Sequence, residues 1–176
     1  MIDRVKAGTF LGLSGTAKVM AAGMLALVAS TAVQAQDQAA LHFSPFMVAI
    51  SVDDIEAETA FYTGMLDFRV EKDISIRDGA VRFRWLTNGT QRIELVKAAG
   101  SQAGTPHPAP PAHAGVRGFT HLTLQTDNIA AVREVLAARG ATVALEPTDV
   151  AALGIRVMYL TDPEGNAVEI AQVTGG

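Results

Sequence analysis

The chain has 176 residues and a formal net charge of −4 at pH 7, and hydrophobic residues make up 49% of it. This length suits one domain with a core of its own, and the negative charge argues against nucleic acid as a partner. The chain has no cysteine, which excludes disulfides, thiolate metal sites and a thiol nucleophile.

Residues 1–35 have the features of an export signal. Basic residues precede an uncharged apolar run over residues 19–29, and small residues up to Ala35 suit a cleavage site. The apolar run is about half of the roughly 20 residues that a membrane-spanning helix needs. We therefore expect an exported, periplasmic protein with no stable membrane span, whose single mature domain covers residues 36–176.

The first part of this domain, residues 46–97, predicts the order strand, helix, strand, strand, strand. Val48, Ile50 and Val52 alternate with other residues as in a half-buried strand. Asp54 suits the cap of the helix that follows, in which apolar residues recur at helical spacing. Turn residues then separate three further predicted strands, at residues 68–72, 80–86 and 91–97.

The next segment, residues 98–118, contains four prolines together with several alanines and glycines. This composition favours extended, weakly ordered backbone, so we interpret the segment as a linker between two structural modules. His107 and His113 lie inside it. We expect both to be solvated histidines on a flexible connection.

Beyond the linker the same order of elements returns over residues 119–173. It predicts a strand at residues 119–126, a helix at 129–139 and strands at 141–145, 155–160 and 167–173. Aligning the two modules places Met47 opposite His121 and Glu94 opposite Glu169, with offsets of 74 and 75 residues. An internal duplication of this kind identifies which strands are equivalent.

The alternation of side chains predicts which residues face a cavity. His121, Thr123 and Gln125 share one face of their strand, while leucines occupy the other face. Glu169 likewise stands opposite the face that Val168 and its neighbours form. These two strands are therefore expected to hold an imidazole and a carboxylate towards one cavity.

Three segments carry a resemblance to a known family: VAISVDDIEAETAFYTGMLDF, HLTLQTDNIAAV and YLTDPEGNAVEIAQ. They are similar to the vicinal oxygen chelate superfamily, which includes glyoxalase I, extradiol dioxygenases and bleomycin resistance proteins. The resemblance implies an α+β fold in which two βαβββ modules form a curled mixed sheet around a cavity. It also implies a homodimer that takes a small-molecule substrate or ligand.

In the active members of that superfamily, the first and last strand of each module supply the ligands of a divalent metal. By resemblance these positions are Met47, Glu94, His121 and Glu169. Glu94, His121 and Glu169 suit Zn, Ni, Mn, Fe or Co, and either glutamate could also serve as the catalytic base. Met47 departs from the pattern, because a thioether is a poor ligand for these ions.

This departure leaves more than one function open. The first is a metal-dependent glyoxalase-type enzyme, similar to lactoylglutathione lyase, that acts on a small oxygen-chelating substrate. The second is a metal-free protein that binds and sequesters a small molecule, as bleomycin resistance proteins do. A dioxygenase would normally need a second histidine, and His42 is a poor candidate for it. Candidate substrate contacts are Met47, Ser51, Arg92 and Thr123.

Overall fold

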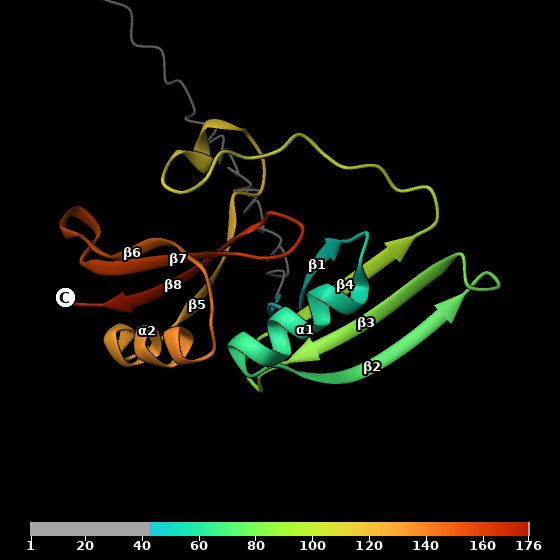
Figure 1. Cartoon of the computed structure of the whole chain (residues 1–176), viewed down its shortest axis with the longest axis horizontal. Coiled ribbons are helices and arrows are strands. Elements are labelled where there is room, and N and C mark those ends of the chain that lie inside the picture. The colour runs from blue at the N-terminus through green and yellow to red at the C-terminus, as the bar shows by residue number, and fades with distance from the viewer. Residues whose placement is uncertain (1–42, 176) are drawn as a thin grey trace, which may run out of the picture. The chain divides into compact units, whose positions relative to one another are not determined.

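The computed structural model describes residues 43–175 (Figure 1). The expected export signal in residues 1–35 and His42 both lie outside this range. Within it, no helix is both long and apolar enough to cross a membrane.

The first module is a four-stranded sheet with one helix. Its strands lie in the order β1-β4-β3-β2, with β1 parallel to β4 and the other neighbours antiparallel. The helix begins where the carboxylate of Asp54 accepts hydrogen bonds of 3.0 Å from the backbone N–H groups of Glu56 and Ala57. The elements are β1 (Val48–Ser51), α1 (Ile55–Leu66), β2 (Arg69–Ile76), β3 (Val81–Thr87) and β4 (Arg92–Ala98).

The second module repeats this arrangement. Its strands lie in the order β5-β8-β7-β6, again with the first strand parallel to the last. The predicted α+β fold of two βαβββ modules is confirmed, as two four-stranded sheets without a closed barrel. The elements are β5 (His121–Gln125), α2 (Ile129–Ala138), β6 (Val143–Val150), β7 (Ile155–Thr161) and β8 (Ala167–Val173).

Each helix covers one face of its own sheet, as Figure 1 shows. The side chains beneath the helices form a shared core. We call the opposite face of each sheet its open face. Burial of a Leu, Ile or Val side chain contributes about 1.5–3 kcal/mol, so this core is the main source of stability. Its fully buried members include Val52, Ile55, Tyr62, Leu86, Ile93, Leu95, Ile129, Leu136, Met158, Leu160 and Val168.

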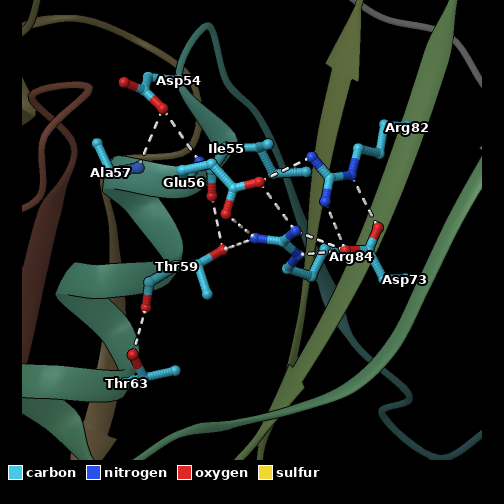
Figure 2. Close-up of polar contacts among 9 residues, drawn as sticks. All are labelled: Asp54, Ile55, Glu56, Ala57, Thr59, Thr63, Asp73, Arg82 and Arg84. Carbon is cyan, nitrogen blue, oxygen red and sulfur yellow. Dashed lines mark hydrogen bonds and ion pairs between the residues drawn. The ribbon is translucent and has the colours of Figure 1, made fainter. Parts of the chain in front are cut away.

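A cluster of charged side chains fastens α1 to its sheet (Figure 2). Arg84, on β3, is only 5% exposed. Its guanidinium donates to Glu56 and Thr59 on α1 at 2.7 Å each, and to Asp73 on β2 at 2.5 and 2.9 Å. Hydrogen bonds from Arg82, with further support from Arg84, lower the pKa of Asp73 to about 2. Two ionised carboxylates thus compensate the positive charge of the buried guanidinium.

Replacing Arg84 by alanine should therefore be much more costly than replacing Arg82. The Arg84→Ala change removes the buried member of the cluster, but Asp73 and Glu56 are 33% and 64% exposed and stay paired with Arg82. We therefore expect a loss of about 1.5–3 kcal/mol in the free energy of unfolding, from the lost charged hydrogen bonds. Arg82, whose side chain is 33% exposed, joins the same carboxylates nearer to solvent, so Arg82→Ala should cost at most about 1 kcal/mol. Urea unfolding of both variants measures the difference, and equal losses would contradict it.

A second buried polar group joins the two modules. Glu58 on α1 is 0% exposed and accepts a hydrogen bond of 2.7 Å from the backbone N–H of Glu164, in the β7–β8 turn. Nearby, the hydroxyl of Tyr62 donates to buried Asp162 at 3.2 Å. The other oxygen of Glu58, Oε2, is buried without a hydrogen-bond partner. Burial, followed by the charge of Asp162, raises the pKa of Glu58 from 4.5 to about 8.

This raised pKa makes the stability of the protein depend on pH. Between about 4.5 and about 8, the unfolded chain has released the proton of Glu58 while the folded chain still holds it. The free energy of unfolding should therefore fall as the pH rises through this interval, by about 1.4 kcal/mol for each unit of pKa shift. Glu58→Gln should remove this contribution, which denaturant unfolding at pH 5, 6.5 and 8 would measure.

The matched control is Glu134→Gln, which changes an exposed glutamate of α2. This variant should keep the pH dependence of the wild type. If Glu58→Gln and Glu134→Gln have the same pH dependence, Glu58 is ionised in the folded protein and the assignment fails.

Candidate functional site

His121 and Glu169 lie on the open face of the second module, as the alternation of their strands predicts. β5 and β8 run parallel, with Thr123 paired to Glu169 and His121 at the start of β5. The Nε2 atom of His121 lies 3.6 Å from Oε2 of Glu169, which is too long for a hydrogen bond. Two atoms that can each bind a metal therefore face each other without a hydrogen bond between them.

Glu169 is held in place by donors on both neighbouring strands. It is 8% exposed. The hydroxyl of Tyr159, on β7, donates to its Oε1, and the hydroxyl of Thr123 donates to its Oε2 at 2.8 Å. Burial and the carboxylate raise the pKa of Tyr159 above its usual value, so this hydroxyl keeps its proton and acts as the donor. These bonds fix the orientation of the carboxylate.

His113 is a member of this cluster that the sequence interpretation missed. The expectation that it is solvated is wrong, because it is 4% exposed. A short 3₁₀ turn, Ala112–Gly115, returns the linker to the open face, and Nε2 of His113 lies 3.0 Å from Nδ1 of His121. Burial, followed by the charge of His121, lowers the pKa of His113. The proline-rich composition of the linker gave no signal for this return, and His107 is only partly buried.

Glu94 occupies the equivalent place on the open face of the first module. The indole N–H of Trp85, on β3, donates to Oε1 of Glu94 at 2.7 Å. Trp85 is paired with Glu94 across β3 and β4, just as Tyr159 is paired with Glu169 across β7 and β8. Each module therefore supports its glutamate with an aromatic donor from the adjacent antiparallel strand.

A pocket of about 270 Å³ opens beside Glu94. Its walls are largely apolar, and the ammonium of Lys72 lies 4.7 Å from the centre of the Trp85 ring. Apolar walls with a few polar groups are typical of small-molecule sites. The lining residues are Lys72, Ile74, Ile76, Phe83, Trp85 and Glu94.

The remaining candidate substrate contacts of the first module lie around this face. Arg92 forms hydrogen bonds of 2.6 and 2.9 Å with Glu71 and stacks over Phe46 at 4.9 Å, so it pairs with Glu71 and not with Glu94. Met47, immediately before β1, is half-buried, and Ser51, at the end of β1, is exposed. Thr123, in the second module, contacts Glu169 as described above.

The three expected metal ligands do not form one group within a single chain. Across residues 43–175, no cluster of three or more His, Cys, Asp or Glu side chains is placed to hold a metal ion. Two ligands about 2.1 Å from a tetrahedral Zn²⁺ lie about 3.4 Å apart, and the 3.6 Å between His121 Nε2 and Glu169 Oε2 is close to this value. This pair thus suits two ligands of an open site, whereas Glu94 lies on the other sheet.

His113 does not convert the pair into a group of two histidines and one carboxylate. It contacts the Nδ1 side of His121, while Glu169 faces the Nε2 side. Among residues 43–175, the three side chains therefore do not present their nitrogen and oxygen atoms to one point. The geometry gives no support to the facial arrangement that a dioxygenase of this kind uses.

Comparison with known proteins identifies the family to which the chain belongs. The model of the Glyoxalase/Bleomycin resistance protein/Dioxygenase superfamily matches residues 44–170. A glyoxalase family protein from Enterococcus faecalis has a similar fold, with a TM-score of 0.58 and 22% identity over 73% of this chain and 97% of that one.

Two glyoxalase I enzymes are similar in fold as well. Glyoxalase I from Zea mays is 19% identical with a TM-score of 0.58, over 73% of this chain and 44% of that one. The trypanothione-dependent glyoxalase I of Leishmania major is 17% identical with a TM-score of 0.52, over 73% and 87%. No curated protein sequence matches this chain. At these identities the structural similarity concerns the fold alone.

Proposed function

Because this chain belongs to the Glyoxalase/Bleomycin resistance protein/Dioxygenase superfamily, we propose that it is a divalent-metal-dependent enzyme of glyoxalase type. Its substrate would be a small molecule with two neighbouring oxygen atoms. The observation that carries the proposal is the pair formed by His121 and Glu169, whose Nε2 and Oε2 atoms face each other at 3.6 Å. Tyr159 holds Oε1 of Glu169 and His113 contacts Nδ1 of His121, so Nε2 faces Oε2, which also accepts a hydrogen bond from Thr123.

His121 and Glu169 would hold the metal through these atoms, and imidazole with carboxylate suits Zn, Ni, Mn, Fe or Co. A metal bound there would polarise the oxygen atoms of the substrate. Tyr159 and Thr123 keep the carboxylate of Glu169 oriented through their hydrogen bonds.

Glu94 would complete the site from a second copy of the chain in a homodimer. Within one chain Glu94 lies on the sheet of the first module, away from His121 and Glu169. The open face of that sheet carries Ile74 and Ile76, which remain 41% and 43% exposed. A second module placed over this face would cover them. Among residues 43–175, only Oε1 of Glu94 accepts a side-chain hydrogen bond, from Trp85. The other oxygen is available to bind the metal or to take a proton from the carbon beside the substrate carbonyl.

Export of the protein, which we propose from residues 1–35, bears on the substrate. Glutathione hemithioacetals and acyl-CoA thioesters, which other members of the superfamily use, are cytoplasmic. A periplasmic enzyme would need another oxygen-bearing substrate, and the apolar pocket beside Glu94 would accommodate its carbon skeleton.

Metal content tests the proposal directly. Protein purified without chelator should contain close to one transition metal per chain by elemental analysis, because each site would have three protein ligands. The His121→Ala/Glu169→Ala double variant and the Glu94→Ala variant should each contain almost none. Wild-type protein that stays metal-free after incubation with Zn²⁺, Ni²⁺ and Co²⁺ would contradict the proposal.

Co-expression of the two variants tests whether subunits share the site. A heterodimer of Glu94→Ala with His121→Ala/Glu169→Ala has one intact site, in which Glu94 comes from one copy and the pair from the other. Isolated through two different affinity tags, it should contain about half of the metal of the wild type. A heterodimer without metal would show that Glu94 acts within its own chain, because neither copy then has all three ligands.

A metal-free binding protein is the second candidate, and the apolar pocket of the first module favours it. Four of its six lining residues are Ile74, Ile76, Phe83 and Trp85, and Lys72 provides one positive charge. An aromatic ligand whose anionic group lies at Lys72, and not at the carboxylate of Glu94, would suit these walls. Met47, half-buried immediately before β1, adds an apolar side chain to the first module.

Trp85 is the only tryptophan of the chain, so its fluorescence reports on the pocket. Anilinonaphthalene sulfonate, an aromatic anion, should quench the emission of Trp85 on binding. Phe83→Ala should weaken this binding about tenfold, since it removes part of an apolar wall. Phe119→Ala, which removes a fully exposed ring outside the pocket, should leave binding unchanged. If both variants bind the dye equally, the dye does not occupy this pocket.

A further inference from the structure

His113 contacts the proposed metal ligand His121 on the side away from Glu169. Its Nε2 lies 3.0 Å from Nδ1 of His121, and the two ring centres are 5.1 Å apart. The hydroxyl of Thr120 also lies 3.0 Å from Nδ1. Nδ1 of His121 is therefore enclosed by two polar groups, while Nε2 faces Glu169 without a hydrogen bond.

The position of the proton on His121 follows from this difference. A neutral imidazole has one N–H group and one bare nitrogen. If Nε2 carried the hydrogen, it would form a short, charge-assisted bond of about 2.7–2.9 Å with the carboxylate of Glu169, but the observed separation is 3.6 Å. With the hydrogen on Nδ1, Nε2 of His113 accepts it and Nε2 of His121 keeps the lone pair that binding a metal requires. His113 then carries its own hydrogen on Nδ1, which is buried without a hydrogen-bond partner among residues 43–175.

The linker holds His113 where it can act in this way. The backbone oxygen of His113 lies 3.1 Å from Nδ1 of His107, and the 3₁₀ turn Ala112–Gly115 places the ring 5.0 Å from that of Tyr159. The His113 side chain is thereby buried between the turn and the sheet. A ring packed in this way has little freedom to move away from His121.

We propose that His113 is a positioning residue that fixes the tautomer and the ring orientation of His121, so that the bare Nε2 faces Glu169. Its benefit to metal binding rests on the proposed function, but the tautomer itself can be measured without any metal. A metal-ligating histidine that donates its other N–H to a fixed partner binds the metal more tightly, commonly by 10–100-fold.

The first experiment determines the tautomer of His121 in the metal-free full-length protein, at a pH where the imidazoles are neutral. Long-range ¹H–¹⁵N correlation spectra of ¹⁵N-histidine-labelled protein should show the hydrogen of His121 on Nδ1. His113→Gln keeps an acceptor at the place of Nε2 and should preserve this tautomer. His113→Asn carries its amide at the place of Nδ1, so it should lose the tautomer, as should His113→Ala.

The second experiment measures the affinity for Co²⁺ by competition with a chelator. We expect His113→Asn to bind Co²⁺ about 10–100-fold more weakly than the wild type, and His113→Gln to stay within about threefold. Asn and Gln both remove the ring, so equal losses in the two variants would show a packing role and overturn the proposal. A hydrogen on Nε2 of His121 in the wild type would overturn it as well.

These results separate the two proposals. If the wild type shows the Nδ1–H tautomer but binds no metal, the enzyme proposal fails while the positioning of His121 by His113 stands. If the wild type binds metal but His113→Asn and His113→Gln behave alike in both measurements, the enzyme proposal stands and the role of His113 fails.

Discussion

The pleat of β8 is the constraint on which the site depends. Val168 and Ile170 are 0% and 4% exposed because they point into the core beneath α2, and Glu169 between them must point to the open face. A slip of one residue in the pairing with β7 would turn Glu169 into the core and expose both aliphatic side chains. The free energy of core burial therefore determines where the carboxylate lies, and through the parallel pairing with β5 it also places His121 beside it.

This dependence explains why much of the fold could be predicted. Strand alternation, helix caps and turn residues are local features, and they gave α1, α2 and the faces of His121 and Glu169 correctly. The ends of some strands were less accurate. β6 runs to Val150 and β2 to Ile76, beyond the predicted residues 145 and 72. In both cases pairing with the adjacent strand extends the element, and such pairing is a tertiary effect that local sequence does not contain.

The site was predicted less completely, for two different reasons. Alternation indicates which face a side chain occupies, but it does not indicate which other sheet meets that face, so Glu94 could not be placed relative to His121. His113 was missed because its position depends on a turn within a segment whose composition is typical of linkers. Its burial arises from contacts with His121 and Tyr159, residues that are 8 and 46 positions away in the sequence.

Both modules contain a glutamate that accepts a hydrogen bond from an aromatic side chain, but the surroundings of the two glutamates differ. Trp85 and Tyr159 each donate a hydrogen bond to a glutamate on the adjacent strand, so both modules present an oriented carboxylate. Glu169 accepts hydrogen bonds from Tyr159 and Thr123 beside a small apolar cluster of its own sheet, whereas the pocket beside Glu94 is lined mostly by apolar side chains. A thioether at position 47 is a poor metal ligand, but it is compatible with an apolar face. On the proposed function, Met47 would be part of a division of roles, in which the second module supplies the polar pair and the first supplies one carboxylate and an apolar wall.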